Sequence, residues 1–144
     1  MLPRLSNKEV LVAIVVGYVP TKEGRAALRR AADESLLRKT KLIVINSSRG
    51  GKDYDGKEAD RFEAELKRVQ DELDQVGIEH EVRHLVRGNE PAEDLIAVAD
   101  EEGADFIVIG LRRRTPVGKL ILGSNAQRIL LDASCPVLAV KAGA

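Results

Sequence analysis

The stretch Phe106-Ile-Val-Ile-Gly-Leu-Arg-Arg113 is followed, after nine further residues, by Gly123-Ser124. Its apolar start predicts a buried strand, and the apolar spacing from Ala126 to Leu131 predicts a helix. A glycine where a strand ends and a Gly-Ser pair where a helix begins are typical of a phosphate-binding loop. Glycine permits close approach of the backbone or positive φ, and the start of a helix favours an anion. We therefore expect Gly110, Gly123 and Ser124 to hold phosphate.

The same residues also have a purely structural interpretation. Gly110 would then be a turn after the strand, and Gly123-Ser124 would cap the helix, since serine is a preferred N-cap residue. Both roles are compatible, because the N–H groups at a helix start are the ones that a phosphate uses. The basic run Arg112–Arg114 lies in a solvated loop or pairs with nearby acidic groups, or else it clamps phosphate. Contact with nucleic acid is a third alternative, which the neutral net charge disfavours.

Outward from this loop, apolar runs and helical spacings alternate along the chain. Strands are predicted at Val10–Val16, Lys41–Asn46, about 79–86, Phe106–Ile109 and Pro136–Val140. Helices are predicted from Thr21 to Arg38, Glu58 to Val76, Pro91 to Glu102 and Ser124 to Leu131, with a glycine-rich loop over Ser47–Gly56. The third strand has the alternation of a half-exposed edge strand, so we expect His80 and His84 to be exposed rather than to bind metal.

This order of elements predicts an α/β fold in one domain over residues 1–144. Strands and helices that alternate through short connections give right-handed crossovers and a parallel sheet covered on both faces. Ligands bind such sheets at the carboxyl ends of the strands, near the switch in strand order. The tips after Val16 and Ile109 should therefore meet at one crevice.

Composition argues against several kinds of partner. The 144 residues carry 23 basic and 23 acidic side chains, and this neutral balance does not suit nucleic acid or an acidic membrane. No apolar run approaches the roughly 20 residues of a membrane span. Cys135 is the one cysteine, so we expect no internal disulfide, a cytoplasmic location and a small buried apolar role for this side chain.

The chain resembles the universal stress protein family over nearly its whole length. The supporting segments are Val10–Leu28, Gly88–Gly110 and Gly110–Lys141, which ends in Ser-Cys-Pro-Val-Leu-Ala-Val-Lys. Members of the family that bind ATP carry a loop with the pattern Gly-x2-Gly-x9-Gly-[Ser/Thr]. In this chain Gly110, Gly123 and Ser124 match that loop in residue type and spacing.

The resemblance implies a fold, a ligand and a mode of assembly. The fold is a three-layer αβα sandwich of the adenine nucleotide alpha hydrolase-like type, with a five-stranded parallel sheet of strand order 3-2-1-4-5. The function is that of a stress-response protein that binds ATP or AMP as a regulatory ligand, with Mg²⁺ if the ligand is ATP. Homodimers would form through the last strand, Val137–Val140. The implied phosphate contacts are Gly110, Arg113, Gly123, Ser124 and Asn125, and the implied adenosine contacts are Gly17, Tyr18, Val19 and Ile45.

Two positions depart from the pattern of the nucleotide-binding members. Val19 stands where they carry an Asp that faces the adenosine, and a valine side chain cannot accept a hydrogen bond. Arg113 stands at the second glycine of the loop, where it would either block the phosphates or supply a guanidinium to them. The alternative function is therefore a dimeric scaffold or interaction protein that does not bind nucleotide, with Val19 and Arg113 disabling the site.

Enzymatic chemistry has little support in the sequence. There is no evident general base and no nucleophile in a triad, so at most slow hydrolysis of bound ATP is expected. A phospho-acceptor receiver domain has the same strand–helix alternation, but it needs acidic residues at the end of the first strand. Ile14-Val-Val-Gly17 contains none, which excludes that class.

Overall fold

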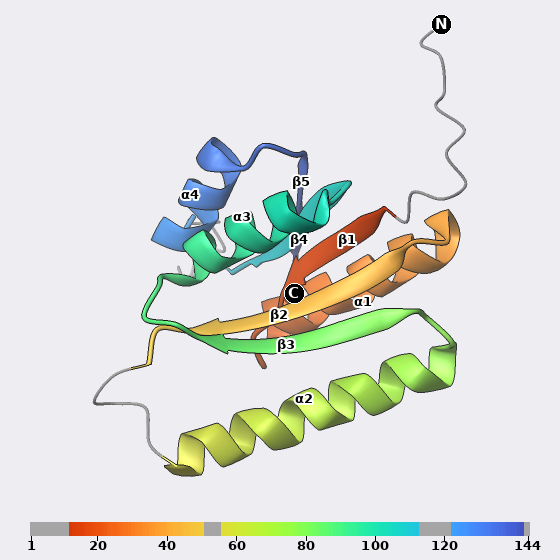
Figure 1. Ribbon diagram of the computed structural model, residues 1–144, viewed down its shortest axis with the longest axis horizontal. Coiled ribbons are helices and arrows are strands. Elements are labelled where there is room, and N and C mark those ends of the chain that lie inside the picture. The colour runs from red at the N-terminus through yellow and green to blue at the C-terminus, as the bar shows by residue number, and fades with distance from the viewer. Residues whose placement is uncertain (1–11, 51–55, 113–121, 143–144) are drawn as a thin grey trace, which may run out of the picture.

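The computed structural model describes residues 12–50, 56–112 and 122–142, in which strands and helices alternate (Figure 1). The strands are β1 Ala13–Gly17, β2 Lys41–Ser48, β3 His80–Val86, β4 Phe106–Leu111 and β5 Val137–Lys141. The helices are α1 Lys22–Arg38, α2 Gly56–Val76, α3 Pro91–Glu102 and α4 Ser124–Asp132. No helix within these residues is long and apolar enough to cross a membrane.

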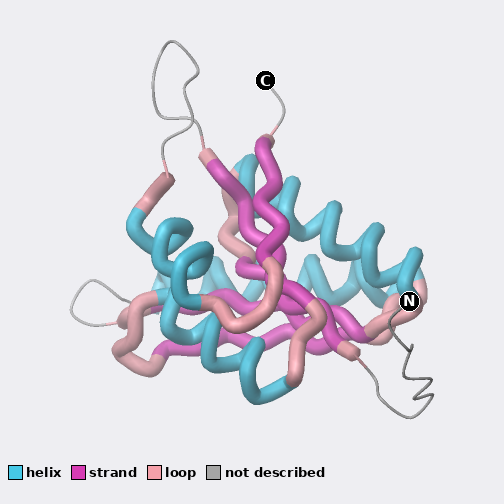
Figure 2. Tube along the Cα trace, turned by 90° about the horizontal axis from the view of Figure 1, so that it is seen from above, coloured by secondary structure: helices cyan, strands magenta, loops and turns pink. Residues whose placement is uncertain are grey.

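The strands form a parallel sheet in the order β3-β2-β1-β4-β5, which confirms the predicted topology. Helices flank both faces of the sheet (Figure 2). One face buries Ile14 and Val44 against α1 and α2, and the other buries Val15 and Ile43 against α3 and α4. Strands covered on both sides need apolar residues at successive positions, which explains the continuous β-branched runs.

Helix ends follow local chemistry that is visible in the sequence. The Thr21 side chain caps α1 by accepting a hydrogen bond from the Gly24 N–H at 3.1 Å. Pro91 occupies the first turn of α3, where its missing N–H costs nothing. Gly77 and Gly103 follow α2 and α3 at φ 79° and 60°, the left-handed conformation that glycine adopts most readily.

Several boundaries differ from the predicted ones by one or more residues. β1 begins at Ala13, and the predicted strand residues Val10 and Leu11 lie outside the described residues. β2 continues to Ser48, so the first two residues of the predicted loop belong to a strand. α2 begins at Gly56, two residues earlier than predicted. β4 continues to Leu111, so Gly110 lies inside a strand, paired with Val140 of β5, and is not the turn at its end.

β3 lies at the edge of the sheet as predicted, but its histidines are not exposed. The His80 side chain is 8% exposed, and its Nδ1 lies 2.6 Å from the Ile78 carbonyl oxygen. The His84 ring packs against Phe62 of α2, and burial lowers its pKa. The expectation was wrong because α2 covers this face of the edge strand. No cluster of metal-ligating side chains occurs in the part of the chain that the structure describes.

Cys135 lies just before β5 and packs, half-buried, against the core between the sheet and the α3/α4 layer. Burial raises the pKa of its thiol, which disfavours the reactive thiolate. These two observations fit the small apolar role predicted for it.

Candidate functional site

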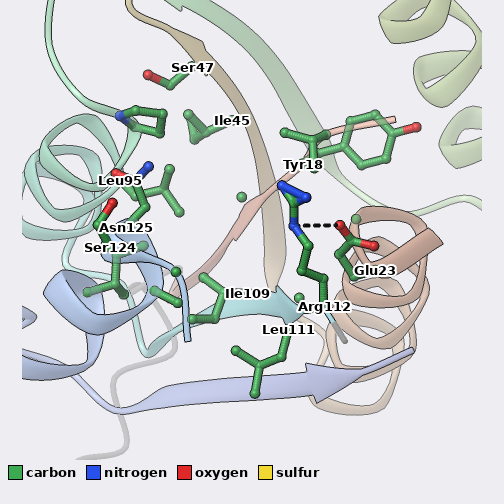
Figure 3. A pocket seen from close by; sticks show the side chains of 18 residues that line it. Tyr18, Glu23, Ile45, Ser47, Leu95, Ile109, Leu111, Arg112, Ser124 and Asn125 are labelled. Carbon is green, nitrogen blue, oxygen red and sulfur yellow. Dashed lines mark ion pairs between the residues drawn. The ribbon is translucent and has the colours of Figure 1, made fainter. Parts of the chain in front are cut away.

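A pocket of about 300 Å³ lies at the carboxyl ends of β1 and β4, where the strand order of the sheet reverses (Figure 3). This is the crevice that the order of elements predicts for a ligand. The pocket brings together every predicted site residue that the structure describes: Gly17, Tyr18, Val19, Ile45, Gly110, Gly123, Ser124 and Asn125. Arg113 lies outside the described residues.

Tyr18 lines the pocket with its main chain rather than with its ring. The ring points away from the pocket toward α2 (Figure 3), and its hydroxyl donates a hydrogen bond to Glu65 Oε1. The Tyr18 carbonyl accepts a hydrogen bond from Asn46 Nδ2 at 2.9 Å, which ties the end of β1 to β2. The side chain is 1% exposed, and burial together with the bond to Glu65 raises its pKa to about 12.

Tyr18→Phe should therefore lower the free energy of unfolding by about 1 kcal/mol at neutral pH, since it removes one hydrogen bond from a buried site. Because the pKa of Tyr18 is raised from its ordinary value of 10.0, the stabilisation by this hydrogen bond is complete below pH 10.0. It is lost as the pH rises through the folded-state pKa of about 12. Urea unfolding of both proteins across this range measures the effect. A gap between them that does not narrow at alkaline pH would contradict the assignment.

Gly110 is required by the packing of α1 against the sheet. A Cβ built on it would lie 2.2 Å from the Glu23 carbonyl oxygen, which is main chain in the first turn of α1. Gly24 is similarly constrained, because a Cβ there would lie 1.9 Å from the Val19 carbonyl oxygen. These two glycines hold the start of α1 against the ends of β1 and β4, which shapes one wall of the pocket.

Gly123 is less constrained by packing than Gly110. Its φ is −69°, and a Cβ added to it would meet no heavy atom of the described residues within 4 Å. It is itself the N-cap of α4, with no side chain to cap the helix, and Ser124 is the first helical residue. Of the predicted Gly123-Ser124 cap, Gly123 is confirmed as the N-cap residue, whereas Ser124 is not the N-cap because it already belongs to the helix.

The first turn of α4 lines the pocket and carries N–H groups that have no partner within the helix. The Gln127 N–H bonds to the Gly123 carbonyl oxygen at 3.0 Å, so the N–H groups of Ser124, Asn125 and Ala126 precede the first bond within the helix. The Asn125 side chain is held in place, since its Oδ1 accepts the Ala92 N–H of α3 at 3.0 Å. The positive end of the helix dipole and these donors make this side of the pocket suitable for an anion.

An ion pair lies on the other side of the pocket. Arg112 Nε is 3.7 Å from Glu23 Oε1, and Figure 3 shows the two side chains meeting there. The Glu23 side chain is 18% exposed and that of Arg112 is 57% exposed. This pairing confirms the interpretation of Arg112 as a partner of an acidic group. The sequence analysis did not identify Glu23, whose position in the first turn after β1 was the available signal.

A buried polar cluster around Asp94 lies beside the pocket and includes Ser47, which lines it. The fully buried Asp94 accepts hydrogen bonds from Ser47 Oγ at 2.6 Å, Arg87 Nη2 at 2.8 Å and Asn89 Nδ2 at 3.0 Å. Burial alone would raise the pKa of Asp94, but the hydrogen bonds from Ser47, Asn89 and Arg87 outweigh it and hold the pKa below its ordinary value. The cluster joins the end of β2 to the β3–α3 turn, and sequence reasoning did not identify it.

An all-parallel sheet with helices on both faces and a pocket at its switch point defines a three-layer α/β domain of the adenine nucleotide hydrolase-like type. The model of the universal stress protein family matches residues 12–141, and the chain belongs to this family.

Individual relatives agree with this assignment. A universal stress protein of Mycolicibacterium smegmatis is 43% identical over 128 residues, covering 89% of this chain and 96% of that protein. A solved universal stress protein from Archaeoglobus fulgidus has a TM-score of 0.80 at 37% identity, covering 90% of this chain and 98% of that one. The universal stress protein from Archaeoglobus fulgidus in complex with dAMP has a TM-score of 0.76 at 32% identity, covering 92% and 99%.

Proposed function

We propose that this stress protein binds an adenine nucleotide, ATP or AMP, as a regulatory ligand in the pocket at the ends of β1 and β4. The observation that carries the proposal is the first turn of α4, which lines the pocket and whose first N–H groups have no partner within the helix. The described residues leave open space at Gly123, where an anion could approach this backbone closely. The complex of a related universal stress protein with dAMP supports the same class of ligand.

The residues of the pocket suit the separate parts of such a ligand. Ser124 and Asn125 would bind phosphate through their N–H groups, and the loop pattern of the family implies Arg113 as a further phosphate contact. The main chain of Gly17 and Tyr18 and the apolar side chains of Val19 and Ile45 would line the adenosine. Mg²⁺ would accompany ATP and shield its phosphates.

Thermal unfolding with AMP, and with ATP plus Mg²⁺, tests the proposal. A ligand at about 100 times its Kd adds about 2.7 kcal/mol to stability, which should raise the Tm by roughly 5–10 °C for a domain of this size. Gly123→Val should abolish the rise, because its side chain fills the space next to the helix start. Gly56→Val is the matched control, since Gly56 also has open space around it at a helix start but lies outside the pocket.

The absence of a shift in the wild-type protein at millimolar nucleotide would contradict the proposal. The second candidate function, a scaffold that does not bind nucleotide, would then take its place. One observation favours that candidate: Val19 is 43% exposed at the pocket and offers no hydrogen-bond acceptor to an adenosine.

We also propose that two copies of the chain form a homodimer in the cytoplasm along β5. This strand lies at the edge of the sheet and pairs on one side with β4. Its residues Val137–Val140 are partly buried within one copy, so pairing with a second β5 would cover both their unpaired backbone groups and their remaining apolar surface.

A further inference from the structure

The two sides of the pocket have opposite polarity. The α4 side presents N–H donors, whereas the α1 side presents the Glu23 carboxylate, which is an acceptor only. Its ion-pair partner among the described residues, Arg112 Nε, lies at 3.7 Å, beyond hydrogen-bonding distance. Among the residues that the structure describes, no hydrogen bond to the Glu23 side chain is formed. The Glu23 side chain is 18% exposed, so the open pocket is the side from which a hydrogen-bond donor can reach its carboxylate.

A ligand that fills the pocket must give the Glu23 carboxylate a donor. A buried charge without a hydrogen-bond partner is unfavourable, and a phosphate at this position would be repelled. The group that faces Glu23 is therefore a hydroxyl or an amino group. A nucleotide has both kinds: hydroxyls on its ribose and an amino group on its adenine.

The order of the strands separates these two possibilities. Ile45 is on β2, Gly17 is on the central β1, and Gly110 is on β4, which leads into the phosphate-binding side. The main chain of Glu23 packs against Gly110 on β4, away from the apolar wall at Ile45 that suits the adenine. Glu23 is thus placed next to the middle of the nucleotide, and the ribose is the part that lies between base and phosphate.

We propose that Glu23 recognises the ribose of the bound nucleotide by accepting hydrogen bonds from its 2′- and 3′-hydroxyls. This inference rests on the proposed function and extends it to selection of ribonucleotides over deoxynucleotides. Glu23 supplies, from the first turn of α1, the acceptor that the Val19 side chain does not provide. Arg112 neutralises the Glu23 charge and so reduces its repulsion of the phosphate.

Calorimetric titration with AMP and with 2′,3′-dideoxy-AMP tests this assignment. Wild-type protein should bind AMP roughly 10- to 100-fold more tightly, the range expected for hydrogen bonds to a charged acceptor. Glu23→Ala should bind the two ligands within about twofold of each other, and Glu23→Gln, which keeps the shape of the side chain, should retain part of the preference. Glu34→Ala is the matched control on α1, because Glu34 is also paired with arginine but lies outside the pocket.

The outcomes separate this inference from the function on which it rests. Equal affinity of the wild-type protein for both ligands overturns the role of Glu23 and leaves nucleotide binding in place. A preference for AMP that survives in both Glu23 variants does the same. Failure of the wild-type protein to bind either ligand overturns the proposed function and this inference together.

Discussion

Gly110→Ala lowers the free energy of unfolding by about 3 kcal/mol, the upper end of the cost of overpacking a well-packed site. The added methyl group would lie 2.2 Å from the Glu23 carbonyl oxygen and 2.7 Å from its carbonyl carbon. Both atoms are main chain in the first turn of α1, so no side chain can rotate away and the helix start itself must shift. Thermal and urea unfolding of the variant measure the loss, which corresponds to a fall in Tm on the order of 10 °C.

Gly123→Ala is the matched control, since its methyl group meets no heavy atom of the described residues within 4 Å and its φ suits any residue. Gly123 is the N-cap of α4, where alanine is less favourable than glycine, so this variant should lose no more than about 1 kcal/mol. Equal losses in the two variants would show that both glycines of the loop serve the fold. That result would argue against the open space at Gly123 in which we place the anion.

Asp94→Ala should lower the free energy of unfolding by about 3 kcal/mol. The change leaves the Ser47 hydroxyl and the Asn89 amide without their acceptor, and it leaves the Arg87 guanidinium without its counter-charge. The Arg87 side chain is 46% exposed and can turn into water, which keeps the loss at the lower end of the range for breaking a buried pair. Asp100→Ala on the exposed face of α3 is the control and should be nearly neutral.

The same cluster predicts how stability depends on pH. The folded protein holds the pKa of Asp94 below its ordinary value of 3.8. The stability that ionised Asp94 contributes is therefore complete above pH 3.8 and is lost as the pH falls through the lower pKa of the folded state. Asp94→Asn should therefore lose less stability than the wild-type protein over that acid range. Parallel acid titrations of the two proteins that keep a constant gap would contradict this assignment.

The fold could be predicted from the sequence because its determinants are local. The β-branched runs, the cap at Thr21 and the glycines after α2 and α3 each act within a few residues, and the alternation of elements determines the layers. Pocket residues such as Gly17 and Gly123 follow from the rule that ligands bind at the switch in strand order.

The remaining features depend on contacts between distant parts of the chain. Glu23 faces the pocket because α1 starts against β4, and its place in the first turn after β1 indicates only that it lies near the crevice. The acceptor role of Asp94 requires β2 and the β3–α3 turn to meet at one buried point. His80 and His84 are covered because α2 lies over the edge strand, and an alternating strand pattern does not show what packs on its second face.

The register of the central strands also bears on how the chain is made. Ile14 and Val16 pair with Phe106 and Val108, so β1 keeps an open edge during synthesis until most of the chain has left the ribosome. Such long-range pairings close slowly, and an unpaired apolar strand is prone to aggregation. A nascent chain that stalls before β4 would thus expose this edge of β1 and would lack the pocket residues that β4 and α4 supply. The pocket is complete only when the last third of the chain has joined the first, because both parts line it.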